Sequence, residues 1–320
     1  MKKGPHPSSF LLHPSSFLLH PSSFILSSSS FILHPSSFIL RSFARFWPSY
    51  FPGGALEFRV TSMLTSAALS DPGRRRQVNE DYYLINRRQD LYILADGMGG
   101  HAAGEVASLL AASTIEEFLV LITGSAEITW PFGYNVRLPY EHNVLQTAVQ
   151  LANSGVSHAA QQAEQYMGMG ATVAVVWVRG TKAFYCHIGD SRIYLHRDTQ
   201  LSQLTQDHSL VQEQVNRGLI TPEEAKTHRL RHVVTRAIGG RDSVDVTVRE
   251  HDLAPGDVLL LCSDGLTDCV PDAEICRILG LQAGPEELCQ QLVAAANQAG
   301  GDDNITVVLI QSSDDGAGKQ

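Results

Sequence analysis

The sequence contains few cysteines, and none of them are paired at a spacing that binds metal. Its five cysteines are Cys186, Cys262, Cys269, Cys276 and Cys289, and they form no C-x-x-C pair. An odd count without ligand spacing leaves no cysteine metal site and suits a reducing compartment. We therefore expect a cytoplasmic protein in which the cysteines serve as small core side chains.

The chain also lacks an excess of positive charge and any long apolar run. Its 24 Lys and Arg against 33 Asp and Glu give a formal net charge of −9, which argues against a general role in binding nucleic acid. No window holds eighteen uninterrupted apolar residues, so no membrane span is expected. A 43% hydrophobic content over 320 residues is enough for one large domain or two modest ones.

The N-terminal part repeats a seven-residue unit, HPSSFLL, from His6 and again from His13, with related copies up to residue 40. Proline in nearly every copy excludes a coiled coil, since proline inside a helix costs about 3 kcal/mol. The recurring His-Pro-Ser-Ser interrupts the apolar stretch that a signal peptide needs. We expect residues 1–62 to be a low-complexity tail without packed structure, or to lie upstream of a true start at Met63.

Residues 63–314 read as one domain, followed by a short polar tail at 315–320. Period-two and period-3.6 apolar patterns predict strands and helices in an order that is not a regular βαβ alternation. This order indicates an α+β protein whose sheets are covered by helices. The predicted strands are 82–86, 91–95, 171–178, 183–188, 192–196, 244–248, 258–262 and 305–310. The predicted helices are 104–121, 143–165, 209–217, one beginning at Thr221, 272–279 and 285–299.

Three apolar runs are bordered by an acid in the same way. Asp96 follows the run 91–95 and precedes Gly97, Asp264 follows 258–262 and precedes a glycine, and Asp303 precedes Asn304 and the last strand. An isolated Asp-Gly is usually an ordinary turn. Three strand ends with this pattern are not expected by chance, and clustered carboxylate and carbonyl oxygens are what hard divalent cations require.

Other polar residues are candidates for the same site. Glu80 and Asp81 begin a predicted strand and could reach a metal directly or through water. Asp190 lies in a tight turn between two strands, where a plain hairpin residue is the alternative. Arg76 belongs to a run of three arginines that is either a solvated basic stretch or a phosphate clamp, because guanidinium matches phosphate with two parallel hydrogen bonds.

As a set, these segments resemble the metal-dependent type 2C family of serine/threonine protein phosphatases in its bacterial form. They occur in the family's order and cover nearly all of residues 71–310. The matching segments are RQVNED at 76–81, ADGMGGHAAGE at 95–105, GAT at 170–172, IGDSR at 188–192, LTQDHS at 204–209, SDGLTD at 263–268 and DNIT at 303–306.

The resemblance implies a four-layer α-β-β-α sandwich of two antiparallel sheets flanked by helices. It also implies two Mg²⁺ or Mn²⁺ ions bridged by Asp96, with Asp264 and Asp303 completing one site. The Gly97 carbonyl and Glu80 or Asp81 would complete the other. Further implied roles are Asp190 as ligand of a weaker third metal, Arg76 as the substrate-phosphate arginine, and residues 207–240 as a mobile flap.

The implied activity is hydrolysis of phosphoserine and phosphothreonine by a metal-activated water, with phosphoproteins as substrates and a bacterial serine/threonine kinase as the opposing enzyme. The chain departs from the animal members at Met98, where they carry a histidine proposed as general acid. Two alternatives are a non-catalytic pseudophosphatase that scaffolds a kinase, which predicts a lost metal acid, and a metal-dependent phosphodiesterase or nucleotide hydrolase.

Overall fold

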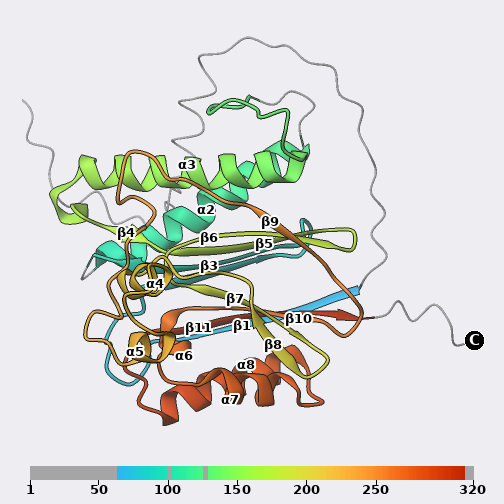
Figure 1. Cartoon of the computed structure of the whole chain (residues 1–320). Coiled ribbons are helices and arrows are strands. Elements are labelled where there is room, and N and C mark those ends of the chain that lie inside the picture. The colour runs from blue at the N-terminus through green and yellow to red at the C-terminus, as the bar shows by residue number, and fades with distance from the viewer. Residues whose placement is uncertain (1–62, 100–101, 125–128, 314–320) are drawn as a thin grey trace, which may run out of the picture. The chain divides into compact units, whose positions relative to one another are not determined.

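The computed structural model describes residues 63–99, 102–124 and 129–313 (Figure 1). The repeat tail and the polar tail expected from the sequence lie outside these described residues. Two antiparallel sheets stack against each other, and helices cover both outer faces. The predicted four-layer α-β-β-α sandwich is therefore confirmed.

One sheet has five strands and the other six, and every pairing within them is antiparallel. The last strand of the chain lies inside the first sheet, between the first strand and β10. In spatial order the first sheet consists of β1 (Met63–Asp71), β11 (Ile305–Ser313), β10 (Val258–Cys262), β7 (Arg192–Arg197) and β8 (Gln200–Gln203). The second consists of β2 (Asp81–Asn86), β3 (Leu91–Met98), β5 (Val173–Arg179), β6 (Lys182–Ile188) and β9 (Arg249–Asp252), with β4 (Gly170–Ala171) paired to β3.

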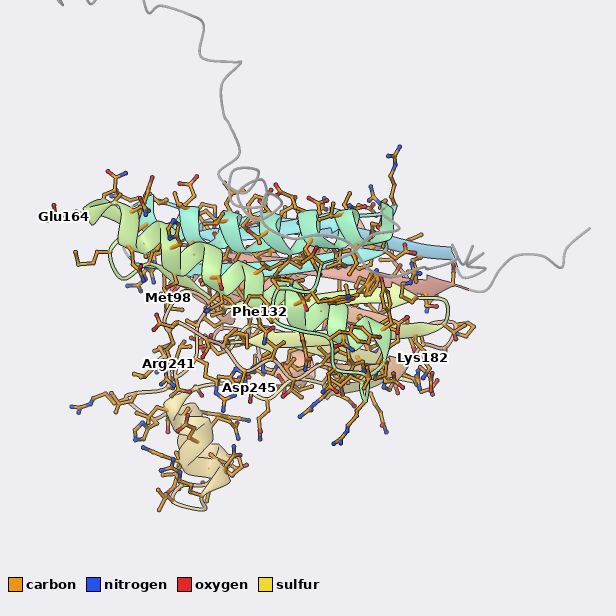
Figure 2. All side chains as sticks on the ribbon, turned by 90° about the horizontal axis from the view of Figure 1, so that it is seen from above. Met98, Phe132, Glu164, Lys182, Arg241 and Asp245 are labelled. Atoms are coloured by element: carbon orange, nitrogen blue, oxygen red, sulfur yellow. The ribbon has the colours of Figure 1, made fainter. Side chains whose placement is uncertain are left out.

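Two long helices, α2 (Ala102–Gly124) and α3 (Tyr140–Gln162), cover the second sheet, and η1 (Glu164–Tyr166) follows α3. The helices α7 (Asp272–Leu279) and α8 (Pro285–Gln298) cover the first sheet. Three short helices, α4 (Leu210–Asn216), α5 (Pro222–Lys226) and α6 (Asp264–Thr267), lie in the connections. Figure 2 shows the region of α4 and α5, in tan, projecting away from the sheets beyond Arg241.

The side chains of β3 show how the layers are filled. Leu91, Ile93 and Ala95 pack against the covering helices, whereas Tyr92 and Leu94 pack against the facing sheet. A strand buried on both faces reads as a continuous apolar run, which is why this segment was recognisable in the sequence. The helix α2 is apolar and long enough to cross a membrane, but 61% of its most apolar window is buried inside the protein, as in a core helix.

One predicted strand is wrong, and the strands β1, β8 and β9 were not predicted. Residues 244–248 have no strand pairing, and the strand β9 begins only at Arg249. Val246 and Val248 are nevertheless buried, because they pack with α3 in the helix layer. The alternation of these residues therefore reports burial rather than sheet pairing. The strand β1, which the sequence did not reveal, pairs with β11 along all nine of its residues.

The short helix α5 confirms its predicted start. The Thr221 hydroxyl accepts a hydrogen bond from the Glu224 backbone N–H, and the Glu224 carboxylate accepts one from the Thr221 N–H. Proline occupies the first turn. This reciprocal capping supplies hydrogen-bond partners for two of the backbone N–H groups that a helix start leaves unpaired, which stabilises a helix of only five residues.

Candidate metal and phosphate site

The pairing register brings the candidate acids to one end of the sandwich. Asp81, the first residue of β2, lies directly opposite Asp96 on β3. On the facing sheet β10 ends at Cys262 and runs antiparallel to β11, so Asp264 and Asp303 leave their strands at a common edge. Asp190 lies in the turn between β6 and β7, which links the two sheets at this same end.

A buried hydrogen-bond network holds Asp81 in this cluster. One Asp81 carboxylate oxygen accepts a hydrogen bond of 2.9 Å from the Ser263 hydroxyl, whose oxygen in turn accepts one of 2.9 Å from the Thr306 backbone N–H. Ser263 and Thr306 are both fully buried. The serine that precedes Asp264 thus connects the acids of the two sheets.

The side chain of Asn304 ties the N-terminal side of the site to the last strand. Its amide oxygen accepts a hydrogen bond from the Glu80 backbone N–H at 2.9 Å. Its amide nitrogen donates to the backbone carbonyls of Pro72, at 3.1 Å, and Val78, at 3.0 Å. The segment that carries Arg76 and Glu80 is therefore positioned by a residue more than 220 positions away.

Gly97 lies where two backbone segments approach closely. Its N–H donates to the Glu80 carbonyl at 3.1 Å. A Cβ atom at this position would be 2.1 Å from the Gly104 carbonyl oxygen and 2.6 Å from that of Glu80. No side chain fits there, so the requirement for glycine next to Asp96 is steric.

Burial and mutual repulsion raise the pKa of the clustered acids. Burial is the main cause of a pKa well above the usual range for Asp96 and Asp264, and the neighbouring carboxylates add to it. Burial raises the pKa of Asp81 to about 6, and burial together with Asp207 raises that of Asp190 to about 6. Asp96 and Asp264 keep an opening to solvent, but protein surrounds them closely enough for their charges to be poorly hydrated.

These acids fit a divalent cation. One Asp81 oxygen is buried without a hydrogen-bond partner among the described residues, although its carboxylate lies in a network that satisfies the other oxygen. Carboxylates that repel one another gain most from a cation placed between them, and oxygen-only ligands are typical of Mg²⁺ and Mn²⁺. The oxygens needed for such a site are therefore present, and a bound cation would neutralise their negative charge.

Arg76 contacts the cluster directly. Its guanidinium donates to Asp303 at 2.7 Å, and half of its side chain remains exposed. The adjacent Arg75 pairs instead with Asp302, which lies at the surface. The sequence left Arg76 open between a solvated basic stretch and a phosphate clamp. The structure distinguishes it from its neighbour, because Arg76 is the one that reaches an acid of the cluster.

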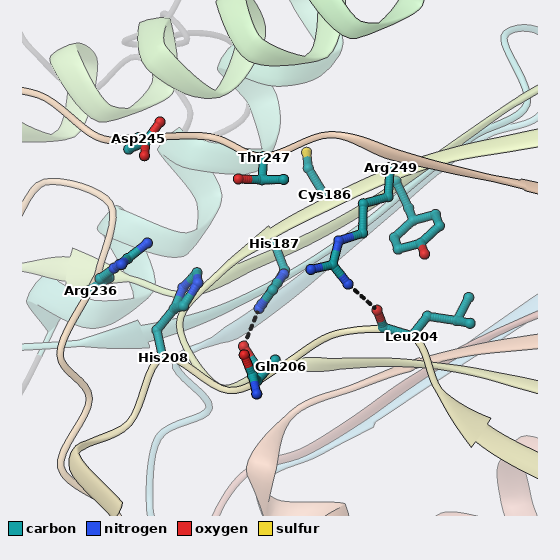
Figure 3. A pocket seen from close by; sticks show the side chains of 10 residues that line it. Cys186, His187, Leu204, Gln206, His208, Arg236, Asp245, Thr247 and Arg249 are labelled. Atoms are coloured by element: carbon teal, nitrogen blue, oxygen red, sulfur yellow. Dashed lines mark hydrogen bonds between the residues drawn. The ribbon is translucent and has the colours of Figure 1, made fainter. Parts of the chain in front are cut away.

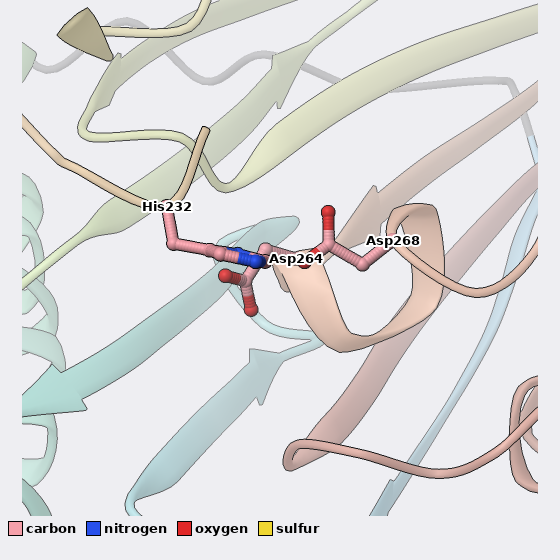
Figure 4. A group of neighbouring side chains, drawn as sticks. All are labelled: His232, Asp264 and Asp268. Carbon is pink, nitrogen blue, oxygen red and sulfur yellow. Dashed lines mark ion pairs between the residues drawn. The ribbon is translucent and has the colours of Figure 1, made fainter. Parts of the chain in front are cut away.

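Two contacts of the flap were not anticipated from the sequence. Arg192 grips Asp207 with hydrogen bonds of 2.7 to 3.1 Å, which fixes the point where the flap begins. Later in the flap, His232 Nδ1 lies 3.0 Å from a carboxylate oxygen of Asp268. The possible ligand atoms of His232, Asp264 and Asp268 all lie within 4.8 Å of one another (Figure 4). The only hint in the sequence is Asp268 in the segment SDGLTD.

The structure thus brings together the residues selected from the sequence. Asp96 interacts electrostatically with Asp81, Asp190, Asp264 and Asp303. Glu80 and Gly97 join them through the backbone hydrogen bond between the two, and Arg76 joins through Asp303. Their individual roles as metal ligands or substrate contacts stay predictions.

The raised pKa values predict how pH affects the metal-free protein. Asp81 and Asp190 have pKa values of about 6, against 3.8 for an ordinary Asp, so the folded state keeps protons that the unfolded chain has released. Their contribution to stability is full below about pH 4 and is lost as pH rises through about 6. Mn²⁺ needs the deprotonated oxygens, so its stabilising effect should grow over the same range. Thermal melts with EDTA and with Mn²⁺ from about pH 5 to 7.5 measure this effect, and a Mn²⁺ shift independent of pH would contradict it.

The chain matches the family model of protein phosphatase 2C over residues 73–304. Protein phosphatase PhpP of Streptococcus pneumoniae is 38% identical over 254 residues, which cover 78% of this chain and 98% of the relative. Serine/threonine protein phosphatase PstP of Mycobacterium tuberculosis is 40% identical over 253 residues, or 78% of this chain and 45% of the relative.

Solved structures agree. The crystal structure of serine/threonine phosphatase Stp1 from Staphylococcus aureus superposes with a TM-score of 0.71 at 34% identity, over 81% of this chain and 98% of that one. The catalytic domain of PstP in complex with two manganese ions gives a TM-score of 0.67 at 37% identity, over 79% and 100%.

Proposed function

This chain belongs to the protein phosphatase 2C family of metal-dependent serine/threonine phosphatases, and we propose that it acts on phosphoserine and phosphothreonine in proteins. The observation that supports this most directly is the convergence of Asp81, Asp96, Asp264 and Asp303 from both sheets. The chain retains every acid of the predicted set, whereas a pseudophosphatase scaffold predicts the loss of at least one.

Two Mg²⁺ or Mn²⁺ ions suit this set of oxygens, as in the PstP structure with two manganese ions. We assign Asp96 to both ions, Asp264 and Asp303 to one, and the Gly97 carbonyl with Glu80 or Asp81 to the other. Asp190 is assigned to a third, weaker ion. When bound, such ions activate water for hydrolysis near neutral pH and offset charge on the phosphoryl oxygens.

The chain's own residues orient the substrate, and its three buried thiols are unsuited to act as a nucleophile. Arg76 is half exposed at the edge of the acids, and its planar fork can grip two phosphoryl oxygens. Cys262 lies next to the site, but burial raises the pKa of its thiol to about 12, so it stays protonated. Burial raises the pKa of Cys186 and Cys289 to about 12 as well. A covalent phosphocysteine route therefore has no support among these three thiols.

Mn²⁺-dependent release of phosphate from a phosphothreonine peptide tests the proposal, with EDTA as control. A panel with a phosphodiester and a nucleotide separates it from the phosphodiesterase alternative. We expect the phosphopeptide to be hydrolysed at least about a hundredfold faster than either. Faster hydrolysis of the diester or nucleotide would refute the proposed substrate class.

We further propose that the enzyme works in the cytoplasm and opposes a serine/threonine kinase. All five cysteines are unpaired, which suits a reducing compartment. The relatives are bacterial serine/threonine phosphatases by name. The pairing would be supported if, in a purified mixture, this enzyme removed the phosphate groups that the kinase had added.

We propose 63–314 as the catalytic domain, which predicts the effect of removing the N-terminal repeats. A chain that begins at Met63 keeps all of β1, so it should match the full chain in melting temperature and in kcat within about twofold. A chain that begins at Pro72 lacks β1 and leaves nine residues of β11 unpaired on one side, so it should be insoluble or inactive. Loss of activity in the Met63 chain would show that residues 1–62 contribute.

A further inference from the structure

A small pocket beside the flap is lined mainly by basic and polar side chains. It measures about 80 Å³ and lies where the end of β6, the segment after β8 and the coil before β9 meet (Figure 3). His187, His208, Arg236 and Arg249 line it, and Asp245 is its one acid. A water molecule takes up about 30 Å³, so the space suits one carboxylate or phosphate group.

The pocket exists because β9 is short. It pairs with β6 only as far as Arg249, which lies opposite Tyr185. The preceding residues turn away to the helix layer, where Gln146 of α3 donates a hydrogen bond of 2.9 Å to the Val246 carbonyl. The last residues of β6 therefore have no strand beside them on this edge, and basic side chains fill the space.

Hydrogen-bond donors face this space without acidic partners. Neither Arg236 nor Arg249 has an acid within ion-pair distance among the described residues, and Arg249 makes only a long 3.5 Å hydrogen bond to the Leu204 carbonyl and a contact with Tyr185. Two guanidinium groups whose charge is not neutralised favour an anion.

The two histidines line the pocket as neutral polar groups. Their rings stack with centroids 4.5 Å apart. His208 accepts the Gly189 N–H at Nδ1, so the neutral ring carries its proton on Nε2. Burial is the main cause that lowers the pKa of His208 to about 4, and the neighbouring His187 and Arg236 add to it. The histidines stay neutral at pH 7, and the arginines supply the charge.

The pocket shares a wall with the acid cluster. His208 exchanges two hydrogen bonds with Gly189, donating its backbone N–H to the Gly189 carbonyl at 2.9 Å. The next residue is Asp190. Arg236 lies on the returning segment of the flap, where the Thr235 N–H donates to the His208 carbonyl at 2.7 Å. A peptide that places its phosphoresidue at the acids can therefore extend across this pocket.

We propose that the pocket is a specificity subsite that binds a second anionic side chain of the substrate, close in sequence to the residue being dephosphorylated. This rests on the proposed phosphatase function. The anion is either a carboxylate or a second phosphate, since guanidinium groups recognise both.

The test uses phosphothreonine peptides in Mn²⁺ with a neutral flank, a Glu, or a second phosphothreonine placed one to five residues away. At its best spacing the anionic peptide should show about tenfold higher kcat/KM than the neutral one. Arg236→Gln and Arg249→Gln should each remove most of that preference while changing kcat/KM for the neutral peptide and for p-nitrophenyl phosphate by less than about twofold. A preference for both anionic peptides would show that the pocket accepts a carboxylate as well as a phosphate. A preference for the doubly phosphorylated peptide alone would show that it requires a phosphate.

Arg88→Gln is the matched control, because Arg88 is exposed in the turn between β2 and β3, at the end of β3 away from Asp96. It should keep the full preference, and thermal melts confirm that all three variants fold. Equal rates for anionic and neutral peptides at every spacing would overturn the subsite and leave the phosphatase function intact. Equal losses on all substrates in the pocket variants would do the same. Absence of Mn²⁺-dependent release from every peptide would instead overturn both.

Discussion

Asp96→Asn is expected to lower kcat by at least about a thousandfold on any phosphomonoester. The carboxylate lies opposite Asp81 and interacts with the acids of the facing sheet, so it is the central charge of the cluster. An amide of the same shape offers one neutral oxygen and cannot compensate two cations. A protein that cannot hold both ions loses most of the rate acceleration that the ions provide. Phosphate release in saturating Mn²⁺ measures the loss.

The same substitution should stabilise the metal-free protein. Asp96 is a buried acid with a raised pKa, so its charge opposes folding at neutral pH, and neutral Asn removes that cost. We expect the melting temperature in EDTA to rise by about 3 °C, corresponding to roughly 1 kcal/mol, while the stabilisation by Mn²⁺ largely disappears. Asp302→Asn is the matched control, because Asp302 is 64% exposed and pairs only with Arg75 at the surface. Near-normal turnover by Asp96→Asn would refute the assignment.

Gly97→Ala is expected to have the second largest effect, through the fold. The added methyl group would lie 2.1 Å from the Gly104 carbonyl oxygen and 2.6 Å from the Glu80 carbonyl oxygen. Both obstacles are backbone atoms, so β3 and the start of α2 must separate. A change of this kind is among the most costly single substitutions, at about 4 kcal/mol or more, which lowers the melting temperature by about 10 °C. Turnover should fall with it, because the separation displaces Asp96.

Gly124→Ala provides the comparison. A Cβ atom at Gly124 meets nothing within 4 Å, so this variant should keep the wild-type melting temperature within about 2 °C. Thermal melts of the two variants side by side distinguish steric exclusion at Gly97 from a general cost of the exchange. A Gly97→Ala protein as stable as Gly124→Ala would show that the backbone can yield at this point.

The sequence predicted the strands whose side chains are apolar at successive positions, a pattern typical of buried strands. The runs that became β3 and β10 are apolar at successive positions because both of their faces are covered. The strand β1 has no such signature, since Thr65, Ser66, Ala67 and Ala68 form its middle, and its extended form depends on pairing with β11. Residues 244–248 gave the opposite error, because alternation records which side chains are buried and carries no information on backbone partners.

The candidate site was predictable to the extent that acids at strand ends converge in an antiparallel sandwich. The sequence could not show that Ser263 and Asn304 orient these acids, since those contacts join residues far apart in the chain. Nor could it place His232 beside Asp264 and Asp268, because the path of the flap depends on anchors such as the Arg192–Asp207 pair.

The three hydrogen bonds of Asn304 have a consequence for biosynthesis. They fix the segment around Glu80, which leaves the ribosome early, to a strand that emerges among the last residues of the domain. That strand also fills the middle of its sheet, between β1 and β10. A nascent chain therefore cannot assemble the acid cluster before translation has passed Asn304 and the strand that follows it.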